Sequence, residues 1–163
     1  MAWVFSLSAE CGDLRESAER FTDYFQNLTL KFADGLEIPC SANVFGGGAS
    51  SWWSLVNPKG IIAGGVDCRV ELCKAERSSE AGFLLYEHLK FAPSFRYAIV
   101  GWEVDGFADA EELNSADLQT LDGLVLSQEF CERLNCFSTF EPFTSNYFWL
   151  PYRGEHGKWQ PYD

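Results

Sequence analysis

The chain has 163 residues, of which 47% are hydrophobic and 16% aromatic, so it has enough apolar material for one domain with a single core. Its 24 acidic and 12 basic residues give a formal net charge of -12, which argues against general binding to nucleic acid or to anionic membranes. The sequence begins without a basic leader and has no apolar stretch of roughly 18 residues, so we expect a soluble, cytoplasmic protein.

The first forty residues predict a strand, a helix and a β-hairpin. Residues 2–8 mix β-branched, aromatic and small side chains, which is typical of a buried strand. Asp13 opens a capping-box pattern, and apolar side chains then recur at spacings of three and four as far as Asn27. This pattern predicts an amphipathic helix with Asp13 as its cap. Asp34 and Gly35 separate two alternating segments, so we expect a hairpin turn at that point.

The middle of the chain predicts several strands and a second helix. In order, we expect an edge or bulged strand at 36–45 because of Pro39, a glycine-rich loop at 46–51, and strands at 52–56 and 66–72. Ser78 or Ser79 should cap the second helix, which should end near Phe91, before Pro93. The near-continuous apolar run at 95–104 predicts a central strand that is covered on both faces.

The remainder of the chain predicts shorter elements. In order, we expect a helical turn at 108–113, a strand at 124–126, a helix at 127–134, a last strand at 147–150 and an irregular tail from Pro151. The whole pattern predicts a single α+β domain over residues 1–163, with a mainly antiparallel sheet and two main helices packed on one face. Residues 105–163 would be an irregular, acidic and aromatic-rich C-terminal portion of that domain.

The six cysteines are expected to be reduced and mostly buried. They are Cys11, Cys40, Cys68, Cys73, Cys131 and Cys136. Their spacing does not match zinc sites, only His88 and His156 could join them, and no acidic stretch matches a calcium-binding loop, so we predict no metal. The motifs of serine hydrolases, phosphate-binding loops and dinucleotide-binding folds are absent from the sequence. We therefore predict no cofactor and assign no catalytic residue.

The negative charge is concentrated in the C-terminal portion. Residues 105–163 contain eleven acidic and three basic residues, whereas residues 58–104 contain six of each. A patch of this kind would raise the rate of association with a basic protein partner. We predict a partner-binding surface that comprises Asp105, Phe107, Asp109, Glu111, Glu112 and Asp117. The favoured function is that of a non-enzymatic, acidic protein that binds a protein partner, as an inhibitor or an immunity-type protein does.

Three alternatives remain open for this chain. In the first alternative, the acidic stretch is a solvated region that only maintains solubility. In the second alternative, the chain is a small enzyme or small-molecule-binding domain with a pocket near Trp53, Glu103 and Asp105, because ligands often gather where strands end. In the third, the protein is a homo-oligomer whose aromatic tail forms the interface.

Aromatic residues are abundant, with 14 Phe, 6 Tyr and 6 Trp. Nine of these rings lie between residues 137 and 162, in a stretch rich in turn-forming residues. Such rings either contact a partner or fasten an irregular tail to its own domain, since they bury a large area at low entropic cost. We favour the second interpretation.

Overall fold

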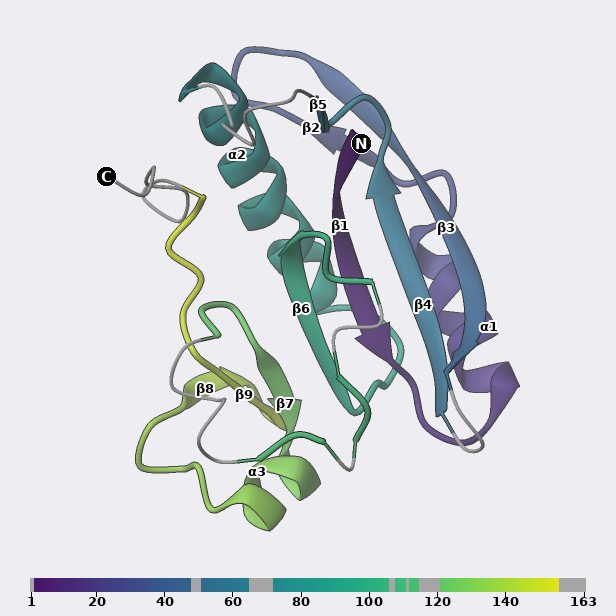
Figure 1. The fold of residues 1–163 in the computed structure, drawn as a ribbon, viewed down its shortest axis with the longest axis vertical. Helices are drawn as coiled ribbons and strands as arrows, with labels where there is room; N and C mark the ends of the chain where they lie inside the picture. The colour runs from purple at the N-terminus through teal and green to yellow at the C-terminus, as the bar shows by residue number, and fades with distance from the viewer. Residues whose placement is uncertain are drawn as a thin grey trace.

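An antiparallel sheet runs through the computed structural model of the protein (Figure 1). The structure describes residues 2–47, 51–64, 72–105, 108–110, 112–114 and 121–155. Within these ranges the strands are β1 (Ala2–Glu10), β2 (Thr29–Lys31), β3 (Glu37–Gly47), β4 (Ser51–Pro58), β5 (Ile62–Gly64), β6 (Tyr97–Trp102), β7 (Val125–Ser127), β8 (Glu141–Thr144) and β9 (Tyr147–Trp149). The helices are α1 (Arg15–Phe25), α2 (Leu72–Leu89) and α3 (Gln128–Leu134).

The strand order places the first strand in the middle of the sheet. Neighbouring strands follow the order β2-β3-β4-β1-β6-β7-β9-β8, and β5 pairs separately with the start of β1. All six residues of β6 are buried beside β1. This confirms the prediction of a central strand that is covered on both faces, and the chain has the α+β fold that its sequence predicts.

Helices α1 and α2 cover one face of the sheet. Phe5 and Leu7 of β1 are fully buried and belong to the same core as Phe21 of α1 and Leu85 of α2. Successive residues of a strand point to opposite faces, so the odd-numbered residues of β1 share this face. The prediction of two main helices on one face is therefore confirmed.

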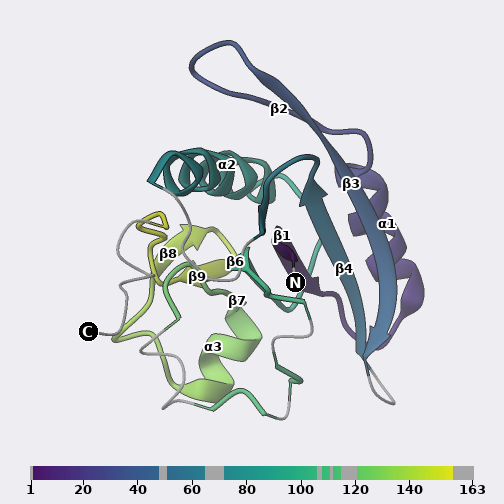
Figure 2. The same ribbon diagram turned by 45° about the horizontal axis from the view of Figure 1, so that its top comes forward.

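Helix α3 and the chain around it cover the opposite face. Trp53 of β4 and Tyr97 of β6 project from that face and pack in a second core with Leu126 and Phe130. Figure 2 shows α2 and α3 on opposite sides of β6. The C-terminal portion thus supplies the second hydrophobic layer of the domain.

The start of α1 differs from the prediction. Leu14 is the N-cap residue, in an extended conformation, and no side chain caps the helix. The predicted cap by Asp13 is wrong because Asp13 lies one residue before the N-cap. Packing of the apolar stripe stabilises α1 instead, since Ala18, Phe21 and Phe25 are fully buried.

Helix α2 is longer than predicted. It begins at Leu72, so the predicted strand at 66–72 is wrong at its last residue, and residues 66–71 lie outside the described ranges. Ser78 and Ser79 lie inside the helix, where both hydroxyls donate to the carbonyl oxygen of Ala75 at 3.2 and 2.6 Å. Neither serine is therefore a cap, because each bonds back to the preceding turn.

No helix in the described part of the chain is long and apolar enough to cross a membrane.

Strand β3 extends into the predicted glycine-rich loop. Gly46 and Gly47 pair with Trp52 and Ser51 of β4, so the predicted loop at 46–51 is wrong at both ends, and residues 48–50 are outside the described ranges. Strand β2 pairs with only the first three residues of β3, which end at Pro39. The outer edge of β3 beyond Pro39 has no partner strand in the described residues, which agrees with the edge character that a proline indicates.

The C-terminal elements largely follow the prediction. Strands β7 and β9 and helix α3 are present, and the Ser127 hydroxyl caps α3 by accepting from the Phe130 amide at 3.4 Å. Strand β8, which contains Pro142 and a bulge, was not expected. Tyr152 is only 4% exposed and packs 5.0 Å from the ring of Tyr86, so it fastens the described part of the tail to α2.

Candidate functional site

The structure does not bring together the residues of the pocket expected near Trp53. Trp53 is 1% exposed, stacked on Phe45 and opposite Glu10 of β1 in the strand register. Glu103 lies beside Val4, whose amide donates to its carboxylate at 2.8 Å. Val4 and Glu10 are six residues apart on one strand, or about 20 Å. Trp53 and Glu103 therefore lie near opposite ends of β1, and the exposed Asp105 follows Glu103.

The structure does describe half of the expected partner-binding surface. Asp105, Asp109 and Glu112 are exposed. The other three expected residues, Phe107, Glu111 and Asp117, lie outside the described ranges.

The segment that carries these carboxylates is held against the second core. The Tyr97 hydroxyl donates to the carbonyl oxygen of Ala108 at 2.5 Å, and the Arg133 guanidinium donates to that of Ala110. Arg133 also lies over the Phe130 ring, 4.1 Å from its centroid. Arg133 belongs to α3, so its hydrogen bond to the Ala110 carbonyl joins this segment to the helix.

Helix α3 adds exposed carboxylates to the same part of the fold. Glu129 and Glu132 are both exposed on α3, and neither belongs to the partner-binding surface that the sequence predicted. We define the acidic surface as Asp105, Asp109, Glu112, Glu129 and Glu132. Asp105 lies on the Glu103 side of this surface, whereas Asp109 and Glu112 flank Ala110, which is bonded to Arg133 of α3. The sequence could have indicated the last two, because the acidic run continues into the predicted helix at 127–134.

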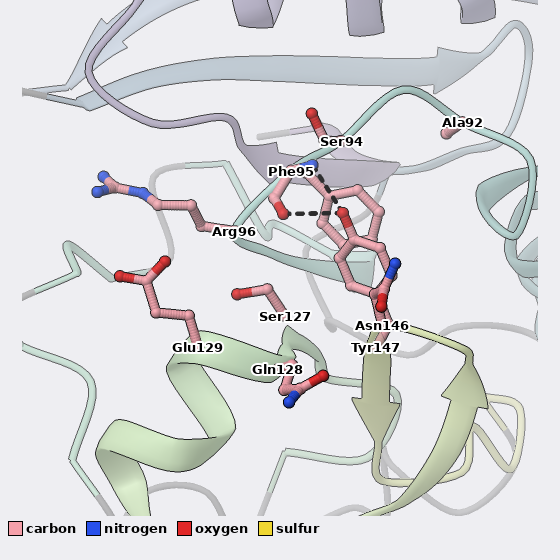
Figure 3. Close-up of a pocket in the computed structure, with 9 residues that line it drawn as sticks. All are labelled: Ala92, Ser94, Phe95, Arg96, Ser127, Gln128, Glu129, Asn146 and Tyr147. Carbon is pink, nitrogen blue, oxygen red and sulfur yellow. Dashed lines mark hydrogen bonds between the residues drawn. The ribbon is translucent and has the colours of Figure 1, made fainter.

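An open cleft of about 530 Å³ lies next to the acidic surface (Figure 3). Three separate segments line it: Ala92, Ser94, Phe95 and Arg96 before β6, Ser127, Gln128 and Glu129 at the start of α3, and Asn146 and Tyr147 at the start of β9. No motif in the sequence joins these segments. The cleft exists because β7 pairs with both β6 and β9.

A buried ion pair fixes Arg96 at the cleft. The Glu10 side chain is 0% exposed, and the Arg96 Nε donates to its Oε2 at 2.6 Å while Nη2 donates to Oε1. Oε1 also accepts from the amide of Gly12 at 3.2 Å. The hydrogen bond to Glu10 raises the pKa of Arg96, although burial acts in the opposite direction. Arg96 is therefore charged, oriented and locally neutralised.

Stacked rings and backbone bonds fix the other walls of the cleft. The ring of Tyr147 stacks on Phe95 at 4.3 Å, and its hydroxyl accepts from the Phe95 amide and donates to the Phe95 carbonyl, both at 3.1 Å. Burial raises the pKa of Tyr147, so its hydroxyl stays protonated. The Gln128 amide donates to the Asn146 carbonyl oxygen at 2.9 Å. The cleft is thus formed by the fold before any ligand binds.

The described thiols are poorly suited to nucleophilic chemistry. Cys11, Cys40, Cys131 and Cys136 are free and buried. Burial raises the pKa of Cys11, of Cys40 and of Cys136 to about 12 in each case, so these thiols are protonated at neutral pH, and a protonated thiol is a weak nucleophile. In the ranges that the structure describes, no group of three or more His, Cys, Asp or Glu residues is placed to hold a metal ion.

Comparison with known proteins gives no relative for this chain, because no family model, no curated protein and no solved structure matches it.

Proposed function

We propose that this protein binds a protein partner with a basic surface, and that it does so through the acidic surface, as an inhibitor or an immunity-type protein. The observation that carries the proposal is the exposure of five carboxylates, three on the segment that begins at Asp105 and two on α3. The nearby cation, Arg133, donates a hydrogen bond to the carbonyl oxygen of Ala110.

The anchored backbone around Asp109 supports the proposal. Tyr97 and Arg133 hold the carbonyls of Ala108 and Ala110, so the backbone on both sides of Asp109 is held in place. A pre-organised surface loses less entropy on binding than a mobile one. Clustered charge of one sign also speeds association with an oppositely charged surface, and salt weakens that effect.

A charge-reversal experiment tests the proposal. One variant carries Asp105→Lys, Asp109→Lys and Glu112→Lys, which changes the acidic surface and leaves the cleft intact. A control variant carries Glu16→Lys, Asp23→Lys and Glu76→Lys, three exposed acids on α1 and α2, so both variants have the same net charge.

Each purified variant is used to capture proteins from a lysate of the cells in which the protein occurs, at low and at high salt. We expect the wild type and the control to capture a basic protein in a salt-sensitive manner, and the Asp105/Asp109/Glu112 variant to lose it while circular dichroism shows a native fold. Equal capture by all three folded proteins would contradict the proposal.

A further inference from the structure

The charges at the cleft are unequal. Arg96 is neutralised by the buried Glu10, whereas Glu129 is exposed and no ion pair within 4.0 Å joins it to Arg96. Figure 3 shows Arg96 and Glu129 extending along the same side of the cleft. Among the charged groups at the cleft, the carboxylate of Glu129 is therefore the one that remains uncompensated. Its charge, together with the net charge of -12, favours a cation over an anion.

The polar side chains of the cleft offer oxygen atoms. The side-chain nitrogen of Gln128 donates to the Glu132 carboxylate at 2.9 Å, which leaves the side-chain amide oxygen of Gln128 as an acceptor. Ser127 and Asn146 also line the cleft, and the Ser127 hydroxyl, which accepts one hydrogen bond from the Phe130 amide, has a second lone pair for a ligand. A guanidinium or ammonium group is a donor with no acceptor, so it is matched by a site of carboxylate, hydroxyl and amide oxygens.

The cleft is continuous with the acidic surface, because Glu129 belongs to both. Its volume of about 530 Å³ lies in the usual range of ligand pockets, so a long side chain with its adjoining backbone fits. We infer that the cleft receives an arginine or lysine side chain of the basic protein partner; this inference rests on the proposed function. Such an anchored side chain would be the central contact of the interface, with the other carboxylates around it.

The inference is tested with a small probe in place of the unidentified partner. N-acetyl-arginine amide is titrated into ¹⁵N-labelled protein, and N-acetyl-citrulline amide serves as the uncharged analogue of the same shape. We expect the arginine compound to shift the backbone amides of residues 94–96, 127–129 and 146–147, and to bind at least about tenfold more tightly than the citrulline compound, since one charge-assisted contact distinguishes them.

Two matched variants locate the charge that matters. Glu129→Gln should weaken binding of the arginine compound about tenfold, because it removes the carboxylate and keeps the side-chain shape. Asp109→Asn removes the same unit of charge outside the cleft lining and should change the affinity less than about twofold. Equal binding of the two compounds, shifts outside the cleft, or equal effects of the two variants would overturn the inference.

The outcomes separate this inference from the proposed function. Loss of partner capture in the Asp105/Asp109/Glu112 variant, with no response of the cleft to the arginine compound, would retain the proposed function and overturn the cleft inference. The opposite result is that the arginine compound binds in the cleft while charge reversal leaves partner capture unchanged. That result would overturn the proposed function, and with it the inference that a protein partner supplies the side chain.

Discussion

Replacing Arg96 should destabilise the protein more than replacing its partner Glu10, although both changes remove the same ion pair. The Glu10 side chain is 0% exposed, whereas that of Arg96 is 34% exposed. Arg96→Met leaves a buried carboxylate without its cation, which costs about 3–5 kcal/mol. Glu10→Gln leaves an arginine that water can reach, and the amide can still accept a hydrogen bond, so we expect a loss of about 1–2 kcal/mol.

Urea unfolding followed by tryptophan fluorescence measures this difference. For an m-value of about 2 kcal/mol/M, the midpoint should fall by about 2 M for Arg96→Met and by less than about 1 M for Glu10→Gln. The double variant should be more stable than Arg96→Met alone, because it carries no buried charge.

An exposed ion pair provides the control for this experiment. Arg15 and Glu19 are joined at 2.8 Å with side chains 64% and 46% exposed, so Arg15→Met should cost less than about 1 kcal/mol. The reasoning would be refuted if Arg96→Met and Glu10→Gln were equally destabilising, or if their effects were additive in the double variant.

Three further predictions concern other parts of the fold. A hydrogen bond from Arg77 lowers the pKa of Asp34 from 3.8 to about 2, so Asp34 contributes stability that is complete above pH 3.8 and is lost as the pH falls toward 2. Asp34→Asn should flatten the pH dependence of the unfolding midpoint in that window, and an unchanged profile would contradict this assignment. An added methyl group at Gly82 would lie 2.4 Å from the Tyr152 hydroxyl, so Gly82→Ala should cost about 1–3 kcal/mol and speed proteolysis of the tail; unaltered cleavage there would argue against it. Because burial raises the pKa of Cys11 to about 12, iodoacetamide at pH 8 should label it at least about a hundredfold more slowly than a free thiol, as peptide mass spectrometry would reveal, and rapid labelling of native protein would count against its burial.

Local patterns predicted most of the helices and strands correctly. The apolar stripe that includes Phe21 and Phe25 lies on one side of α1, and the apolar run at 95–104 became the buried strand β6. These elements depend on side-chain periodicity, which neighbouring residues determine. Two helix starts were less predictable: Asp13 and Ser78 are good capping residues by type, yet α1 begins after Leu14 and α2 begins at Leu72.

The candidate site was only partly accessible to sequence reasoning. An excess of acids after residue 104 is a property of composition, and exposure of Asp105, Asp109 and Glu112 follows from the cost of burying unpaired charge. The cleft was missed because its residues come from three segments, each of which is unremarkable alone. Glu10 and Arg96 are 86 residues apart, and no periodicity indicates that they form an ion pair.

The sequence by itself thus determined the fold class, the apolar faces and the distribution of charge, because these depend on residue type and on spacing within one element. Tertiary structure decided which residues meet. The alternation of apolar and polar residues in a strand indicates which face of the sheet a side chain occupies, but the register between strands determines its neighbours on that face. That register separates Trp53 from Glu103 along β1, and the pairing of β7 with β6 and β9 brings Arg96, Ser127 and Tyr147 around one cleft.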